Sequence, residues 1–317
     1  DGTHITLLAN MEMPDDLPYI HKANADGVGL FRTEFLYLNH AELPDEDVQF
    51  VAYRKVARRM KGQEVILRTI DLGADKIKDK VLSLMRVTQN PALGLRGIRL
   101  CFAEQQLFVT QLRAMLRASI FGKLKIMIPM LASADEIHQV LGIIETVKAS
   151  LRSEGIAFDE DVEIGAMIEV PSAAIVLEPF LKHFSFISVG TNDLIQYVLA
   201  VDRDNDSVAH LFNSSHPAIL KLLADIFKKA DRAGVQVSLC GEMAGNPEMT
   251  RLLLGLGLRR FSMPVSALLT VKERILHTDI TEQKKMVQKI MRADDPIKVR
   301  ALVEKLNAMS PPTKPSR

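Results

Sequence analysis

The chain has 317 residues, of which 47% are hydrophobic and 25% are charged, and this composition suits a soluble globular protein with one large or two ordinary domains. Its 40 basic and 39 acidic residues leave a net charge of +1, so no overall field favours binding to nucleic acid or to a membrane surface. No apolar run is long enough to span a bilayer and no secretory signal is visible, which argues against membrane insertion.

In chain order, short runs of β-forming residues alternate with stretches of helical spacing. Eight strands are expected, at 5–9, 27–31, 64–70, 125–130, 163–168, 184–189, 235–239 and 260–263. Helices are expected at 14–25, at 44–60, up to 118, at 133–151, from 171, from 191, from 214 or 215 to 233, at 247–256 and over the remainder to about 308. The segment 79–122 is longer than one crossover requires, and we interpret it as an elaborated loop and helix inserted after the third strand.

Alternating strands and helices indicate parallel strands, and eight repeats are the number that closes a (β/α)8 TIM barrel of the α/β class. The main alternative is an open doubly wound sheet, which needs a glycine-rich phosphate loop after its first strand. Residues 10–13 read Asn-Met-Glu-Met and are not such a loop. We therefore expect a barrel over residues 1–308 and a disordered tail over 309–317. Since the chain has no initiator methionine, we expect it to be part of a longer protein.

The strongest local pattern is the passage from the sixth strand into its helix. Thr191, Asn192 and Asp193 are all residues that commonly cap helices. They would present an amide and a carboxylate at the carboxyl end of a strand, which is the face where TIM-barrel sites lie. The other residues expected at strand ends on this face are Asn10, Arg32, Arg68, Pro129, Glu169, Cys240 with Glu242, and Met263.

Each of these residues has an ordinary interpretation when taken alone, as a surface charge or as a small buried thiol. Together they suit a phosphorylated carboxylic acid. Arg32 and Arg68 could grip phosphate, because a planar guanidinium matches its oxygens two at a time. Glu169 and Asp193 could hold Mg²⁺, which prefers carboxylate oxygens, whereas none of the eight histidines falls at an expected strand end, which argues against zinc. Cys240 could donate a proton, because an ordinary thiol is largely protonated at neutral pH.

Six motifs resemble the C-terminal domain of enzyme I, the phosphoenolpyruvate–protein phosphotransferase family of the bacterial sugar phosphotransferase system. They are Gly29-Leu-Phe-Arg-Thr-Glu-Phe-Leu36, Leu67-Arg-Thr-Ile-Asp-Leu-Gly-Ala-Asp-Lys76, Asn90-Pro-Ala-Leu-Gly-Leu-Arg96, Gly190-Thr-Asn-Asp-Leu-Ile-Gln-Tyr197, Val201-Asp-Arg-Asp-Asn205 and Cys240-Gly-Glu-Met-Ala-Gly245. The motifs are long, occur in order and extend over nearly the whole expected barrel.

The resemblance implies a barrel that binds phosphoenolpyruvate (PEP) and Mg²⁺. It assigns Arg32 and Arg68 to the phosphate with help from Lys76 and Arg96, and it assigns Asn192 and Arg203 to the carboxylate end of PEP. Glu169 and Asp193 become the metal ligands, with Asp193 also lying against PEP. Cys240 becomes the group that protonates the pyruvate enolate. The PEP-binding residues implied are Arg32, Arg68, Lys76, Arg96, Asn192, Asp193 and Arg203.

The resemblance also implies partners. The phosphoryl group would pass to a histidine on a separate N-terminal domain and from there to the histidine phosphocarrier protein, as the first step of a phosphotransferase system that serves sugar uptake, a nitrogen-linked relay or a fused variant. The barrel would carry a homodimer interface. Because the two cysteines, Cys101 and Cys240, make no disulfide framework, the expected location is the reducing cytoplasm.

One feature departs from the family. The phosphorylated histidine of enzyme I lies in a Gly-Gly-x-x-Ser/Thr-His context, and this chain has no Gly-Gly pair. Ser215-His-Pro-Ala-Ile219 imitates part of that context, but His216 falls at an expected helix start, and we interpret it as structural. The chain is therefore expected to bind PEP without carrying the phosphoryl group itself.

Two rival functions remain. The PEP/pyruvate domain of a pyruvate phosphate dikinase or PEP synthase shares the barrel and its chemistry, although the motif wording favours enzyme I. A regulatory or dimerisation module without turnover is expected to have lost the thiol or a metal carboxylate, and both are present here.

Overall fold

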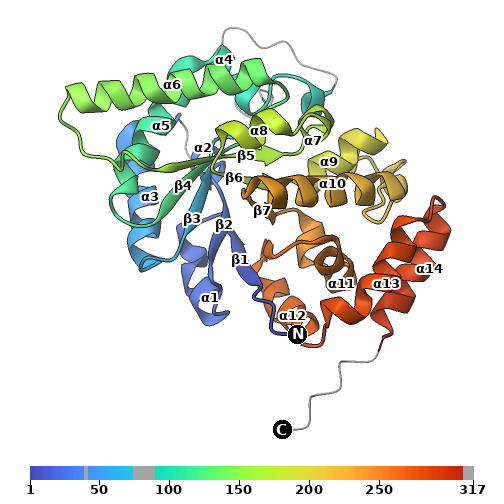
Figure 1. Ribbon diagram of the computed structural model, residues 1–317. Helices are drawn as coiled ribbons and strands as arrows, with labels where there is room; N and C mark the ends of the chain where they lie inside the picture. The colour runs from blue at the N-terminus through green and yellow to red at the C-terminus, as the bar shows by residue number, and fades with distance from the viewer. Residues whose placement is uncertain (39–41, 74–89, 310–317) are drawn as a thin grey trace.

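The computed structural model describes residues 1–38, 42–73 and 90–309, and its centre is a closed barrel of parallel strands (Figure 1). The strands are β1 (Thr6–Met11), β2 (Gly27–Arg32), β3 (Val65–Arg68), β4 (Leu124–Ile128), β5 (Glu163–Ile168), β6 (Phe186–Val189), β7 (Gln236–Leu239) and β8 (Arg260–Pro264). Each strand pairs with the next along the chain, and Leu8 of β1 pairs with Ser262 of β8. The expected (β/α)8 barrel is thus confirmed, and the open sheet is excluded because the first and last strands pair with each other.

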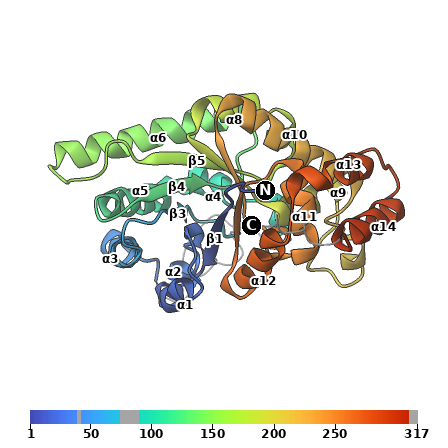
Figure 2. The same ribbon diagram turned by 60° about the horizontal axis from the view of Figure 1, so that its bottom comes forward.

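Helices surround the barrel (Figure 1). They are α1 (Leu17–Lys22), α2 (Phe35–Leu38), α3 (Glu46–Arg59), α4 (Ile98–Ala103), α5 (Gln105–Ser119), α6 (Ala134–Ser153), α7 (Pro171–Ile175), α8 (Glu178–His183), α9 (Thr191–Leu199), α10 (Pro217–Ala233), α11 (Pro247–Leu256), α12 (Val265–Leu276), α13 (Ile280–Met291) and α14 (Pro296–Asn307). The last two helices pack on α11 and on each other, at the periphery (Figure 2). Among the described helices, none has the length and apolarity to cross a membrane.

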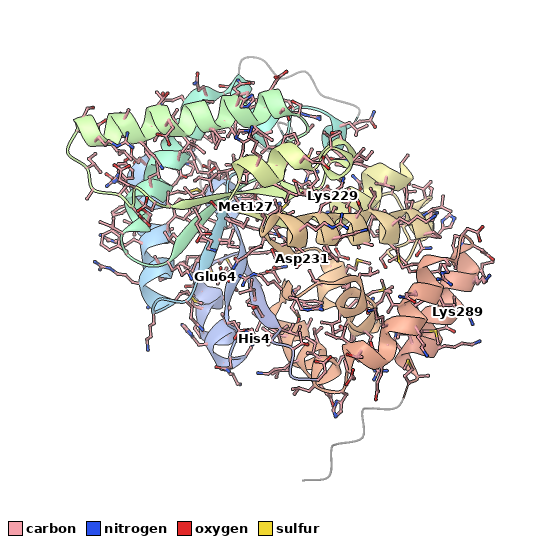
Figure 3. All side chains as sticks on the ribbon, viewed as in Figure 1. His4, Glu64, Met127, Lys229, Asp231 and Lys289 are labelled. Atoms are coloured by element: carbon pink, nitrogen blue, oxygen red, sulfur yellow. The ribbon has the colours of Figure 1, made fainter. Side chains whose placement is uncertain are left out.

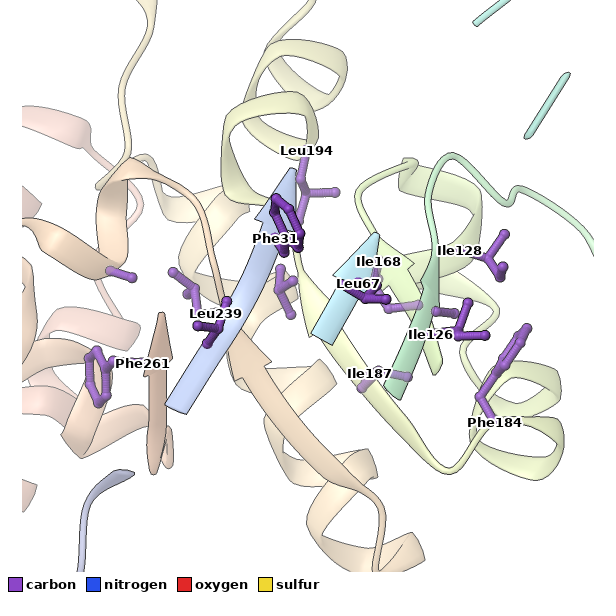
Figure 4. Packing of buried hydrophobic residues seen from close by; sticks show 14 of the residues in the cluster. Phe31, Leu67, Ile126, Ile128, Ile168, Phe184, Ile187, Leu194, Leu239 and Phe261 are labelled. Atoms are coloured by element: carbon purple, nitrogen blue, oxygen red, sulfur yellow. The ribbon is translucent and has the colours of Figure 1, made fainter. Parts of the chain in front are cut away.

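The strands bury both of their faces, which explains why they read as nearly continuous apolar runs. Outward-facing residues such as Leu67, Ile126 and Leu239 join one large cluster with the helices (Figure 4). A separate inner cluster fills the barrel, and its members are Leu30, Ile66, Met127, Met167, Phe186 and Cys240. Cys240 is therefore the uppermost residue of the inner core, and it also lies at the carboxyl ends of the strands, which form the mouth of the barrel.

Charged side chains close the amino-terminal end of the barrel. Lys125 is almost fully buried, with its Nζ 3.0 Å from Glu163 Oε2 and 3.4 Å from Glu64 Oε2. The guanidinium of Arg260 also pairs with Glu64, which Figure 3 labels low on the barrel. The Lys125 ammonium lies 5.3 Å from the centre of the Phe186 ring. These contacts seal the end opposite the mouth.

Two expected helix caps are wrong. The helix α9 begins at Thr191 with Gly190 as its N-cap, and no side chain caps it, because Asn192 and Asp193 bond instead to groups across the mouth. The helix α10 is capped by His216, whose Nδ1 accepts from the N–H of Ala218 at 3.1 Å, rather than by Ser214 or Ser215. The structural interpretation of His216 is consistent with that bond. The expected tail lies outside the described residues, apart from Met309.

Candidate active site

A cavity of about 430 Å³ opens at the carboxyl ends of the strands. It gathers most of the residues that the sequence predicted for a site. Those lining it are Arg32, Arg68, Arg96, Glu169, Asn192, Asp193, Arg203 and Cys240. Lys76 lies outside the described residues. Side chains from β2, β3, β5, α9 and the end of β7 thus meet at one mouth, as the barrel geometry requires.

Three buried carboxylates form the acidic part of the cavity. Asp71, Glu169 and Asp193 each place one oxygen within 4.8 Å of the others. Glu169 and Asp193 were predicted, whereas Asp71 was given no role. Its signals in the sequence are its position three residues after the strand-end arginine Arg68 and its place inside the motif Leu67-Arg-Thr-Ile-Asp-Leu-Gly-Ala-Asp-Lys76.

Glu169 is the carboxylate best suited to a cation. Its Oε1 accepts from the backbone N–H of Met130 at 2.8 Å, but its buried Oε2 has no hydrogen-bond partner among the described residues. Burial, reinforced by the charges of Asp71 and Asp193, raises the pKa of Glu169 to about 8. An unpartnered carboxylate oxygen beside two other carboxylates fits a divalent cation that prefers oxygen ligands, such as Mg²⁺.

Two arginines neutralise part of this acidic group. Arg68 lies between Glu34 Oε1, 3.0 Å from its Nη2, and Asp71 Oδ2, 2.9 Å from its Nη1. Arg96 bonds both oxygens of Asp71 at 2.9 and 3.0 Å and both oxygens of Asp193 at 2.9 and 3.1 Å. Although burial alone would lower it, the pKa of each arginine is raised by these carboxylates. The side chains therefore alternate in charge from Glu34 to Asp193.

The remaining cations lie at the rim, where they are more exposed. Arg32 pairs with Glu12 at 2.8 Å, and 38% of its side chain is exposed. Arg203 lies with its Nη1 3.8 Å from Glu242 Oε1. Glu242 in turn accepts from the side-chain amide of Asn192 at 3.1 Å. Because these weak, solvated contacts cost little to exchange, the rim groups are available to a ligand.

The thiol of Cys240 lies at the floor of the cavity and is 2% exposed. It donates to the carbonyl oxygen of Val189 at 3.6 Å. Burial raises the pKa of Cys240 to about 11, so the thiol keeps its proton at neutral pH. The next residue must be glycine, because a Cβ at Gly241 would lie 2.0 Å from Thr191 Oγ1.

Gly97, the residue after Arg96, adopts φ +56° and ψ −131°, a conformation that side chains disfavour. A Cβ there would lie 2.8 Å from Met130 Cγ and 3.1 Å from Asp71 Oδ1. We expect Gly97→Ala to lower the free energy of unfolding by about 3 kcal/mol and to disturb the bonds of Arg96. Chemical denaturation measures the loss.

Gly155→Ala is the matched control, because Gly155 also has a positive φ, +68°, but has open space around it. Its expected cost is about 1 kcal/mol. Equal losses in the two variants would contradict the close contact assigned to Gly97.

Comparisons with known proteins identify the family of this chain. A family model described as the PEP-binding domain of PEP-utilising enzymes matches residues 1–280. The chain is 50% identical over 307 residues to the phosphoenolpyruvate-protein phosphotransferase of Cupriavidus necator, which covers 96% of this chain and 52% of that protein. It is 43% identical over 304 residues to the protein of the same name from Bacillus subtilis, with 96% and 53% covered.

The chain spans about half the length of the curated relatives it matches. Among solved structures, a citrate lyase from Burkholderia xenovorans covers 96% of this chain and 91% of its own, with a TM-score of 0.55. At 12% identity, that likeness supports the fold alone.

Proposed function

The chain belongs to the PEP-utilising enzymes through their PEP-binding domain, and from that premise we propose that it binds PEP with Mg²⁺ and donates the PEP phosphoryl group to a histidine on a separate N-terminal domain. Pyruvate is the product. The curated relatives reported above are phosphotransferases, which favours this function over a pyruvate phosphate dikinase or PEP synthase. The observation that carries the proposal is the single cavity in which arginines, buried carboxylates and a protonated thiol meet.

Glu169 and Asp193 are the proposed ligands of Mg²⁺, because Glu169 offers an unpartnered oxygen and Asp193 lies beside it. When bound, Mg²⁺ would supply positive charge that stabilises the phosphoryl oxygens and the enolate of pyruvate. Asp71 stays with Arg68 and Arg96 in this assignment, since it pairs with both arginines, whereas Asp193 pairs with Arg96 alone. Two carboxylate ligands are typical of a Mg²⁺ site, since this ion usually keeps several waters and binds substrate phosphate as well.

The arginines bind and orient the phosphoryl group. Arg68 and Arg96 are held rigidly by carboxylates and present fixed charge, whereas Arg32 approaches from the rim. We assign Lys76 to the same group from the family motif. Charge that develops on the phosphoryl oxygens is stabilised by donors already in place, so little reorganisation is needed in the transition state. Asn192 and Arg203, across the mouth, are assigned to the PEP carboxylate.

The protonated thiol of Cys240 is the proposed proton donor for the second half of the reaction. As the bond from phosphorus to the bridging oxygen of PEP breaks, a bond forms from phosphorus to the histidine nitrogen of the N-terminal domain, and the enolate of pyruvate remains. Cys240 Sγ then gives its proton to the methylene carbon, which yields pyruvate and a thiolate that regains a proton from solvent. A thiol of pKa about 11 is protonated when the enolate forms.

The same proposal names the partners. The phosphohistidine domain receives the group and passes it to the histidine phosphocarrier protein, as the first step of the phosphotransferase system, and the barrel forms a homodimer. No basic surface field favours nucleic acid, since the net charge is +1. We place the reaction in the cytoplasm, because Cys240 must stay a free thiol.

Ligand-dependent melting tests the binding step. PEP with Mg²⁺ is expected to stabilise the folded chain by about 2.7 kcal/mol at roughly 100 times its dissociation constant, which raises the melting temperature. Pyruvate with Mg²⁺ is expected to do much less, because it lacks the group that the arginines bind. No shift with PEP, together with no heat in calorimetry, would defeat the site assignment.

A further inference from the structure

We propose that Gln111, which lies behind the active site, positions Arg68 and Asp71 for PEP by holding the loop that follows β3. The proposal rests on the proposed function, because it assumes that these residues serve PEP binding. Gln111 lies on α5, is 0% exposed and does not line the cavity. No family motif in the sequence includes it.

The amide of Gln111 joins the ends of two strands. Its Oε1 accepts from the backbone N–H of Ile70 at 2.8 Å, just beyond β3. Its Nε2 donates to Thr33 Oγ1, just beyond β2, at 3.0 Å. The hydroxyl of Thr33 then donates to the backbone carbonyl of Arg68 at 2.9 Å. One helix side chain therefore connects to both residues that flank Thr69.

The hydrogen bonds allow one orientation of the amide. A backbone N–H can only donate and a backbone carbonyl can only accept. The hydroxyl of Thr33 must therefore donate to Arg68 and accept from Gln111. The second N–H of Gln111 donates to the hydroxyl of Tyr53 at 3.3 Å. That hydroxyl donates in turn to Gln49 Oε1 at 3.1 Å. Burial raises the pKa of Tyr53, which keeps this hydroxyl a donor. A buried network in which each donor has its acceptor is rigid.

The loop after β3 is held one residue at a time. The N–H of Thr69 donates to the carbonyl of Met127 on β4 at 3.0 Å, which continues the strand pairing. The N–H of Ile70 then donates to Gln111, and the N–H of Asp71 donates to Glu34 Oε1 at 2.8 Å. Backbone pairing with β4 thus ends at Thr69, and the next backbone N–H, that of Ile70, bonds to the side chain of Gln111 instead.

A change in the backbone at Ile70 is passed to the cavity because the next residue, Asp71, lines it. Ile70 directly precedes Asp71, whose carboxylate orients both Arg68 and Arg96. A shift of the Ile70 backbone therefore displaces one carboxylate and two guanidinium groups together. Misplacement of binding groups by about 1 Å can cost on the order of 100-fold in function. Gln111 touches no substrate in this proposal and acts only as a positioning residue.

The principal test is Gln111→Leu, which keeps the side-chain volume and removes its three hydrogen bonds. We expect the PEP dissociation constant in the presence of Mg²⁺ to rise about 10- to 100-fold, measured by calorimetry well below the melting temperature. Gln283→Leu is the matched control, because Gln283 is also buried, at 3% exposure, but lies on α13 and does not line the cavity. Its PEP affinity is expected to stay unchanged.

A second pair of variants keeps the test decisive if Gln111→Leu does not fold. Thr33→Val is nearly isosteric and removes the hydroxyl that bonds Arg68, so PEP binding should weaken about 10-fold. Thr33→Ser keeps the hydroxyl and should restore most of the affinity. In the double variant, the PEP dissociation constant should rise by less than the product of the two single-variant increases, because Gln111 and Thr33 act through one network.

The Arg68 side-chain Nε–H resonance in NMR spectra gives a readout that needs no PEP. It should shift in Gln111→Leu and stay in place in Gln283→Leu. An unchanged resonance and unchanged PEP affinity in Gln111→Leu and Thr33→Val, with only a lower melting temperature, would overturn the proposal. Failure of the unaltered chain to bind PEP contradicts the proposed function instead, and the NMR comparison still decides the positioning role.

Discussion

Replacing Cys240 with alanine is expected to leave PEP binding nearly intact while pyruvate formation falls by about 10²- to 10⁴-fold. The thiol lies at the floor of the cavity and bonds the carbonyl oxygen of Val189, whereas the proposed phosphate ligands are arginines. Because its pKa is raised, the Cys240 thiol is protonated and uncharged at neutral pH, so it can donate a proton but adds no charge for binding. Affinity depends on the charged groups, whereas completion of the reaction depends on the proton, so the two measurements should separate.

The measurement supplies a separate histidine domain and follows pyruvate with lactate dehydrogenase and NADH. Cys101→Ala is the control, because Cys101 is the other buried thiol but lies on α4 and does not line the cavity. It should form pyruvate at the unaltered rate. Pyruvate release at an undiminished rate in Cys240→Ala would remove that residue from its proposed role.

Replacing Glu169 with glutamine is expected to abolish detectable Mg²⁺ binding and, at the same time, to make the ligand-free chain more stable. Burial raises the pKa of Glu169 from its ordinary 4.5 to about 8. The stability that this group contributes is therefore present below about pH 4.5 and is lost as the pH rises toward 8. Glutamine does not ionise, so the variant should gain about 3 kcal/mol over the unaltered chain at pH 7.

Denaturation curves across that pH range test the sign. The advantage of Glu169→Gln should be small near pH 4.5 and should grow up to about pH 8. Asp193→Asn is the informative contrast, because it too removes a proposed metal ligand but weakens two bonds to Arg96, so it should destabilise the chain. A pH-independent difference between Glu169→Gln and the unaltered chain would contradict the buried, unpartnered carboxylate.

Much of the barrel and its mouth could be predicted, because each step depends on local pattern. Arg32 and Arg68 each end a run of apolar β-forming residues, and Glu169 directly follows one. Parallel strands in a closed ring then bring those ends together whatever the sequence between them. The cavity around Arg32, Arg68, Glu169, Asp193 and Cys240 follows from that geometry.

Residues that act through loops could not be predicted in the same way. Asp71 and Glu34 become important only because Arg96 and Arg68 return to meet them, 25 and 34 residues away along the chain. Gln111 has an unremarkable place in an amphipathic helix, and its role depends on which strand ends lie behind that helix. The cap of α9 was mispredicted for a related reason, since Asn192 and Asp193 have better partners across the mouth.

The sealed lower end of the barrel has a consequence for the order of events. The space between Glu64, Lys125 and Phe186 is too small for a water molecule, so the described residues leave no opening at that point below the cavity. Under the proposed function, PEP, pyruvate and the acceptor histidine would then all approach through the opening at the carboxyl ends of the strands. A partner domain that, under the same function, brought the acceptor histidine to this opening would have to leave before the next PEP could enter, so its residence time there would limit turnover.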